Sequence, residues 1–150
     1  PSLPGRLVQA LARRAAPAPP PAPPAAERAR LARALAPLLD PARAPGARAV
    51  CLAFTAPGCR LCRRLRGPLA DFRAREADWL EVVEVDVSCP GWLPEVVHYD
   101  VRDVPCFVLL RGAGARAAAR SPPPRSLALC LRSLQALGQC RPPPPRGAAP

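Results

Sequence analysis

The chain has 150 residues, a length that holds one domain of about 100 residues with flanking segments. All 22 basic residues are arginine, but residues 49–139 carry only +3 of the net charge of +11, and aromatic residues make up only 4% of the chain. This balance argues against a nucleic-acid-binding surface. No apolar run approaches the roughly 18 residues of a membrane span. Seven cysteines with one close pair favour a reducing compartment over a secreted disulfide scaffold.

The two ends of the chain have a composition that cannot form a packed core. Residues 1–26 combine three arginines with a proline- and alanine-rich run and contain no acidic residue. We expect this segment to be disordered, and it resembles either the basic part of an organelle transit peptide or a linker. Residues 140–150 are rich in proline and predict a disordered tail.

The first predicted elements are a helix and a strand. Residues 27–39 place leucines at helical spacing behind the acidic Glu27, which favours the N-terminal end of a helix. Pro37 predicts a kink or an earlier stop of this helix. After a loop at residues 41–46, the apolar run at residues 50–54 predicts a buried strand.

A pair of cysteines follows this strand. A Pro-Gly turn breaks the strand, and Cys59-Arg60-Leu61-Cys62 opens an arginine-rich helical segment. Residues three apart on a first helical turn share one face, so the two sulfurs can form and break a small disulfide. Unpaired backbone N–H groups and the helix dipole there favour a thiolate, and Arg60 and Arg63 add positive charge. The favoured interpretation is a dithiol redox site, and the alternatives are half of a zinc site or a permanent disulfide.

The second half of the chain predicts alternating strands and helices. In chain order these are a second central strand at residues 80–87, a short helix at 92–99, a strand at 106–110 led by Pro105, a hairpin turn at 111–114, an edge strand at 115–120, and a last helix that is capped by Ser126 and ended by Gly138.

From about residue 27 to residue 139, this order of elements resembles the thioredoxin fold, an α/β fold with a central mixed sheet flanked by helices. The resemblance is carried by three motifs, AFTAPGCRLC, VVEVDV and DVPCFVLLRGAG. It implies that Pro105 is a cis-proline beside the dithiol and that Val104 and Pro105 contact an extended substrate. The Pro-Gly-Cys and Arg-Gly-Ala details are most similar to the plastid atypical Cys/His-rich thioredoxins.

Four features depart from the pattern of ordinary thioredoxins, and one of them is the Arg-Leu pair between the two cysteines. Gly58 replaces the usual aromatic residue before the first cysteine, Cys106 replaces the usual threonine after the cis-proline, and Ala53 replaces the buried strand carboxylate. With no carboxylate at Ala53 to take the proton of Cys62, we expect slow resolution of mixed disulfides.

The sequence therefore predicts a thiol-disulfide oxidoreductase that acts on disulfide- or dithiol-containing proteins. Cys59 is the expected nucleophile and Cys62 the resolving thiol, while Arg60 and Arg63 stabilise the thiolate. This reaction needs no metal or cofactor besides the dithiol. A glutaredoxin-like, glutathione-dependent enzyme and a non-catalytic thioredoxin-fold binding module are the alternatives. The resemblance and the basic N-terminal segment favour the chloroplast as location, with the mitochondrion second.

The remaining sulfur and imidazole groups have less specific interpretations. Cys106 is either a third redox thiol or a buried small hydrophobic residue. His98 is expected to be a solvated or core histidine. Four further cysteines are expected to be inert, namely Cys51, Cys89, Cys130 and Cys140.

Overall fold

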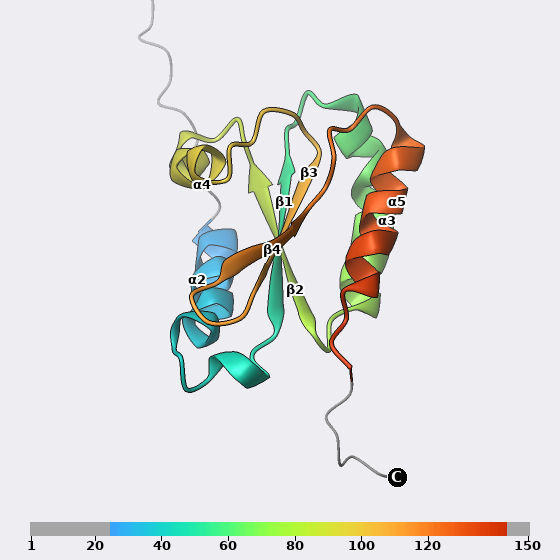
Figure 1. Cartoon of the computed structure of the whole chain (residues 1–150). Coiled ribbons are helices and arrows are strands. Elements are labelled where there is room, and N and C mark those ends of the chain that lie inside the picture. The colour runs from blue at the N-terminus through green and yellow to red at the C-terminus, as the bar shows by residue number, and fades with distance from the viewer. Residues whose placement is uncertain (1–24, 144–150) are drawn as a thin grey trace, which may run out of the picture.

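The computed structural model describes residues 25–143, so the predictions for residues 1–24 and 144–150 lie outside the described residues. The described chain folds as alternating helices and strands around one sheet (Figure 1). The elements in order are α2 (Ala25–Leu39), η1 (Ala44–Gly46), β1 (Ala49–Thr55), α3 (Arg60–Arg75), β2 (Leu80–Asp86), η2 (Pro90–Trp92), α4 (Leu93–His98), β3 (Cys106–Arg111), β4 (Arg116–Arg120) and α5 (Leu127–Gln139).

The sheet is mixed, as the sequence predicts, and its strand order is β2-β1-β3-β4. Strands β1 and β2 pair in parallel, which requires a crossover, and α3 supplies it. Strand β3 pairs antiparallel with β1 and forms a hairpin with β4. The strand predicted at residues 80–87 is present as β2, but its predicted central position is wrong, because β2 lies at the edge of this sheet. Helices cover both faces of β2. Its apolar residues therefore indicate that the strand is buried, but they do not indicate its position in the sheet.

Two hydrophobic layers hold the sheet between its helices (Figure 1). Successive side chains of a strand point to opposite faces, so Cys51 and Ala53 face one layer while Leu52 and Phe54 face the other. Buried residues of α3 and α5 complete the first layer, and residues of α2 and the η2 segment complete the second. β1 is thus buried on both faces, and only its end is left at the molecular surface, where the chain turns into α3.

The ends of two helices differ from their predictions. Helix α2 continues through Pro37 to Leu39, so the chain makes no earlier stop at this proline. Helix α5 is capped by Ser126, whose side chain accepts a hydrogen bond from the N–H of Leu129, as expected. It then continues through Gly138 instead of ending there. A methyl group at Gly138 would make only ordinary contacts with Phe72 and Glu76. Helix α5 packs against α3 and ends at Gln139, one residue beyond the predicted end.

The hairpin between β3 and β4 is formed as predicted. Gly112 and Gly114 both have positive φ angles, of 70° and 82°, which glycine adopts without steric cost. The N–H of Gly114 donates to the carbonyl of Leu38, which ties the hairpin to the end of α2. Within residues 25–143, no helix is both long enough and apolar enough to cross a membrane.

Candidate redox site

The cysteine pair lies where β1 passes into α3. Cys59 is the N-cap residue of α3, and its Sγ accepts a hydrogen bond of 3.1 Å from the N–H of Cys62. The two cysteines are joined as a disulfide, with their Cα atoms 5.2 Å apart. In the reduced protein, the same backbone N–H and the positive end of the helix would stabilise a thiolate on Cys59. The predicted position of the first cysteine at a helix start is thus confirmed.

The two sulfur-bearing residues differ in exposure. Cys59 is half-buried at the surface, whereas Cys62 is only 6% exposed and faces the interior from the first turn of α3. A protein-sized partner can therefore reach Cys59 far more readily than Cys62. This difference favours Cys59 as the attacking sulfur and leaves Cys62 for an intramolecular step.

The loop that precedes β3 brings a proline against this disulfide. The Val104–Pro105 bond is cis, as the resemblance implies. Pairing of β3 with β1 places Cys106 beside Phe54, close to the end of β1. As a result, the carbonyl oxygen of Val104 lies 3.6 Å from Cys59 Sγ although the residues are 45 positions apart. Pro105 is buried and Val104 half-buried, so backbone of this loop borders the attacking sulfur.

Arginines surround the start of α3 without neutralising partners. Arg63 donates from Nη1 to the carbonyl of Pro57 at 3.2 Å, which holds its guanidinium over the turn before Cys59. The ion pairs recorded for residues 25–143 involve six arginines, but none of the four on the first two turns of α3, which are Arg60, Arg63, Arg64 and Arg66. All four are exposed. The local field around the dithiol is therefore positive.

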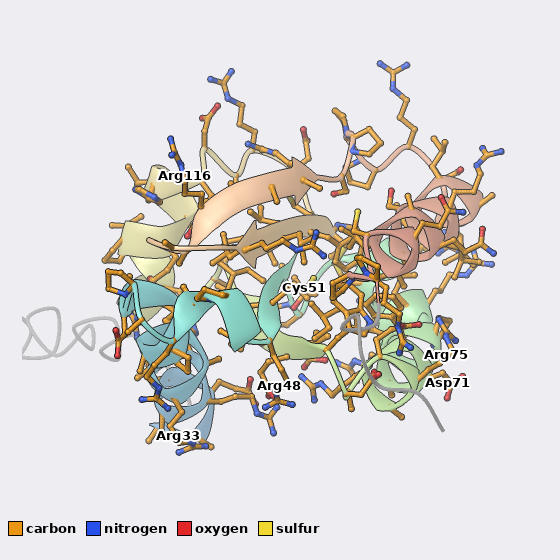
Figure 2. The ribbon with its side chains drawn as sticks, turned by 60° about the horizontal axis from the view of Figure 1, so that its bottom comes forward. Arg33, Arg48, Cys51, Asp71, Arg75 and Arg116 are labelled. Carbon is orange, nitrogen blue, oxygen red and sulfur yellow. A yellow bond between two sulfur atoms is a disulfide. The ribbon has the colours of Figure 1, made fainter. Side chains whose placement is uncertain are left out.

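We expect the substitution Arg60→Gln to lower the redox potential of the dithiol. A cation near the sulfur favours the anion and hence the reduced form, so its removal should make the disulfide a weaker oxidant. For one exposed charge the shift should be roughly 5 to 20 mV. Titration of the wild type and the variant against a glutathione buffer measures it. Arg33→Gln is a matched control, since Arg33 is exposed on α2 and lies far from α3 (Figure 2). Equal shifts in the two variants would show that the arginines near the dithiol do not set its potential.

Cys62 lines a cavity of about 240 Å³ that opens to the surface. Its walls come from the end of β1, the first turns of α3, and strands β2 and β3. The charged lining residues include Arg63 and Arg66 on α3 and the carboxylates Glu84 and Asp86 on β2. Sequence reasoning did not single out these two acids. Their spacing of two in the VVEVDV strand was the available signal, because alternate residues share one face.

The other cysteines take no part in the disulfide. Cys51 is fully buried in the middle of the molecule (Figure 2), and burial, together with the nearby Cys106, raises its pKa to about 12. Such a thiol is protonated at neutral pH and unreactive. Cys89, Cys106 and Cys130 are also buried, and Cys140 is half-buried. His98 is exposed, with its ring edge-on to Tyr99, which agrees with a solvated histidine. Within residues 25–143, no three side chains of the types that bind metals gather at one point.

The described chain has the thioredoxin fold, with the cysteine pair at the start of α3. Three solved structures share its fold: the germline-specific thioredoxin Deadhead of Drosophila melanogaster, thioredoxin O2 of Arabidopsis thaliana in the oxidized state, and thioredoxin f2 of Chlamydomonas reinhardtii. Their TM-scores are 0.53, 0.55 and 0.51 at 21%, 19% and 17% identity. The matches cover 73%, 75% and 63% of this chain and 90%, 87% and 81% of those chains.

A curated protein is also similar in sequence. It is the thiol:disulfide interchange protein TxlA of Synechococcus elongatus, 36% identical over 67 residues. The match covers 45% of this chain and 35% of TxlA, so the chain spans about a third of the length of this relative. No protein-family model matches the chain. The predicted thioredoxin likeness is confirmed, while the finer likeness to plastid atypical Cys/His-rich thioredoxins stays a prediction.

Proposed function

We propose that the protein is a thiol-disulfide oxidoreductase that exchanges disulfides with partner proteins through Cys59 and Cys62. The Cys59 thiolate attacks a partner disulfide, a mixed disulfide forms, and Cys62 displaces the partner's sulfur to restore the intramolecular disulfide. The observation that carries this proposal is the contrast between a reachable Cys59 at a helix N-terminus and a buried Cys62 one helical turn later. The similarity to TxlA supports it.

The partner's chain is proposed to bind along the loop beside Cys59. An extended segment that presents its disulfide to Cys59 would lie against the backbone of Val104 and Pro105, because the Val104 carbonyl borders the sulfur. The exposed arginines at the start of α3 would favour partners with acidic residues near their disulfide. Arg60 and Arg63 are proposed to stabilise the attacking thiolate.

The test is to trap partners with a Cys62→Ser variant. This variant retains Cys59 but lacks the resolving thiol, so mixed disulfides with true partners should persist and be released by dithiothreitol. The matched control is the variant with both Cys59→Ser and Cys62→Ser, which should retain nothing covalently. Two results together would instead favour a non-catalytic binding module. These are an empty trap and a Cys59 that reacts with iodoacetamide at neutral pH no faster than an ordinary thiol.

We further propose a plastid location. The similarity to a cyanobacterial protein and to algal and plant thioredoxin structures supports it, although the basic segment at residues 1–24 lies outside the described residues. Imaging a fluorescent fusion of the complete precursor tests the location. A diffuse cytosolic signal would contradict it.

A further inference from the structure

Resolution of a mixed disulfide needs a group that takes a proton from Cys62. The thiol of Cys62 must become a thiolate before it attacks, and its position in the interior keeps bulk water from serving freely as the acceptor. The neighbouring position on β1 is Ala53, which carries no ionisable group. The acceptor must therefore come from another element that borders the cavity beside Cys62.

Strand β2 places a carboxylate next to Ala53. In the parallel pairing of β1 and β2, Ala53 lies opposite Glu84, so adjacent backbones bring the two residues to about 5 Å apart between Cα atoms. Partners in register share one face of the sheet, and Ala53 faces the layer covered by α3. Glu84 therefore points to the side of the sheet from which Cys62 approaches; both residues line the same cavity, and Glu84 stands at its solvent-exposed rim.

The other carboxylates of this cavity are already engaged. Asp86 accepts hydrogen bonds through Oδ1 from the N–H and the hydroxyl of Ser88, which ties it to the turn after β2. Glu27 pairs with Arg30 through Oε1, and its Oε2 accepts from the backbone N–H of Glu84. The side chain of Glu84 has no recorded hydrogen bond or ion pair within residues 25–143. It is therefore the carboxylate that is free to accept a proton.

The cavity is able to hold the water that links these groups. Its volume of about 240 Å³ is several times larger than the space that one water molecule needs. Its wall also contains Trp92, a fully buried side chain whose indole N–H has no hydrogen-bond partner among the described residues. A buried donor of this kind is normally satisfied by ordered water.

We propose that Glu84 is the proton acceptor for Cys62, acting through water held in this cavity; the proposal rests on the proposed function. The Cys62 thiol passes its proton to the Glu84 carboxylate, and the resulting thiolate attacks Cys59 Sγ. The bond from Cys59 to the partner's sulfur breaks as the Cys59–Cys62 bond forms. The partner's sulfur leaves with the electron pair as a thiolate and takes a proton, so its original disulfide is reduced by two electrons while the dithiol is oxidised.

The test measures the two steps separately in a Glu84→Gln variant. The first step is the attack of Cys59 on a small aromatic disulfide, and the second is the release of the second aromatic thiolate when Cys62 closes the ring. We expect the first rate to stay unchanged and the second to fall about tenfold, less than the roughly 10²–10⁴-fold of general-base catalysis because water remains in the cavity. Asp71→Asn is the matched control, because Asp71 is exposed and points outward from α3 (Figure 2).

A second variant protects the test against a merely structural effect. Adding Ala53→Asp to Glu84→Gln supplies a carboxylate from the adjacent strand and should restore the second rate. An unchanged second rate in Glu84→Gln, with normal attack by Cys59, would overturn this proposal alone. Absence of attack by Cys59 in the wild type would overturn the proposed function itself.

Discussion

Replacing Cys59 with serine is expected to lower the rate of disulfide reduction by about 10³-fold or more. A serine hydroxyl at neutral pH has almost no anionic form, so the stabilisation offered by the start of α3 has no thiolate to act on. The buried Cys62 cannot substitute, because partner proteins do not reach it. Turnover of insulin with dithiothreitol as reductant measures the loss.

Two further variants make this result specific. Cys62→Ser should retain the first attack at near the wild-type rate but accumulate the mixed disulfide, since the intramolecular step is missing. Cys140→Ser changes a half-buried cysteine outside the site and should leave turnover unaltered. A Cys59→Ser variant that still turns over insulin at more than a tenth of the wild-type rate would show that another thiol performs the chemistry.

Replacing Phe54 with alanine is expected to cost about 3–5 kcal/mol of folding stability. Phe54 is completely buried, belongs to the layer under α2 and η2, and packs against Tyr99 with ring centroids 6.2 Å apart. Removing the ring loses its burial and leaves a cavity that β1, held by strands on both sides, cannot collapse to fill. The total free energy of unfolding of a domain is roughly 5–15 kcal/mol, so this loss is a large fraction of its stability.

Urea unfolding followed by circular dichroism measures this effect. The midpoint should fall while the slope of the transition stays constant, because the surface exposed on unfolding barely changes. Phe54→Leu keeps most of the apolar volume and should lose less than half as much. Phe54 faces the layer opposite to Cys62, so the folded fraction should retain its redox chemistry. A loss below about 1 kcal/mol would mean that this layer is less tightly packed than the structure indicates.

Several features of this protein were determined by the sequence alone, because their signals are local. The apolar run of β1, the Pro-Gly turn and the Cys-Arg-Leu-Cys spacing place a dithiol at a helix start, and the structure confirms Cys59 as the N-cap. The glycines after β3 likewise predicted the hairpin, since its turn needs positive φ angles that few residues adopt, whereas the cis bond at Pro105 was expected only from the resemblance to the thioredoxin fold.

Other features depended on contacts between distant segments, which local patterns do not contain. Only the strand pairing shows that β2 is an edge strand. It also shows that Glu84 lies opposite Ala53 and so brings a carboxylate next to a position that has none. The unequal exposure of Cys59 and Cys62 arises in the same way: both occupy the first turn of one helix, and the sheet beneath that helix covers only the second sulfur.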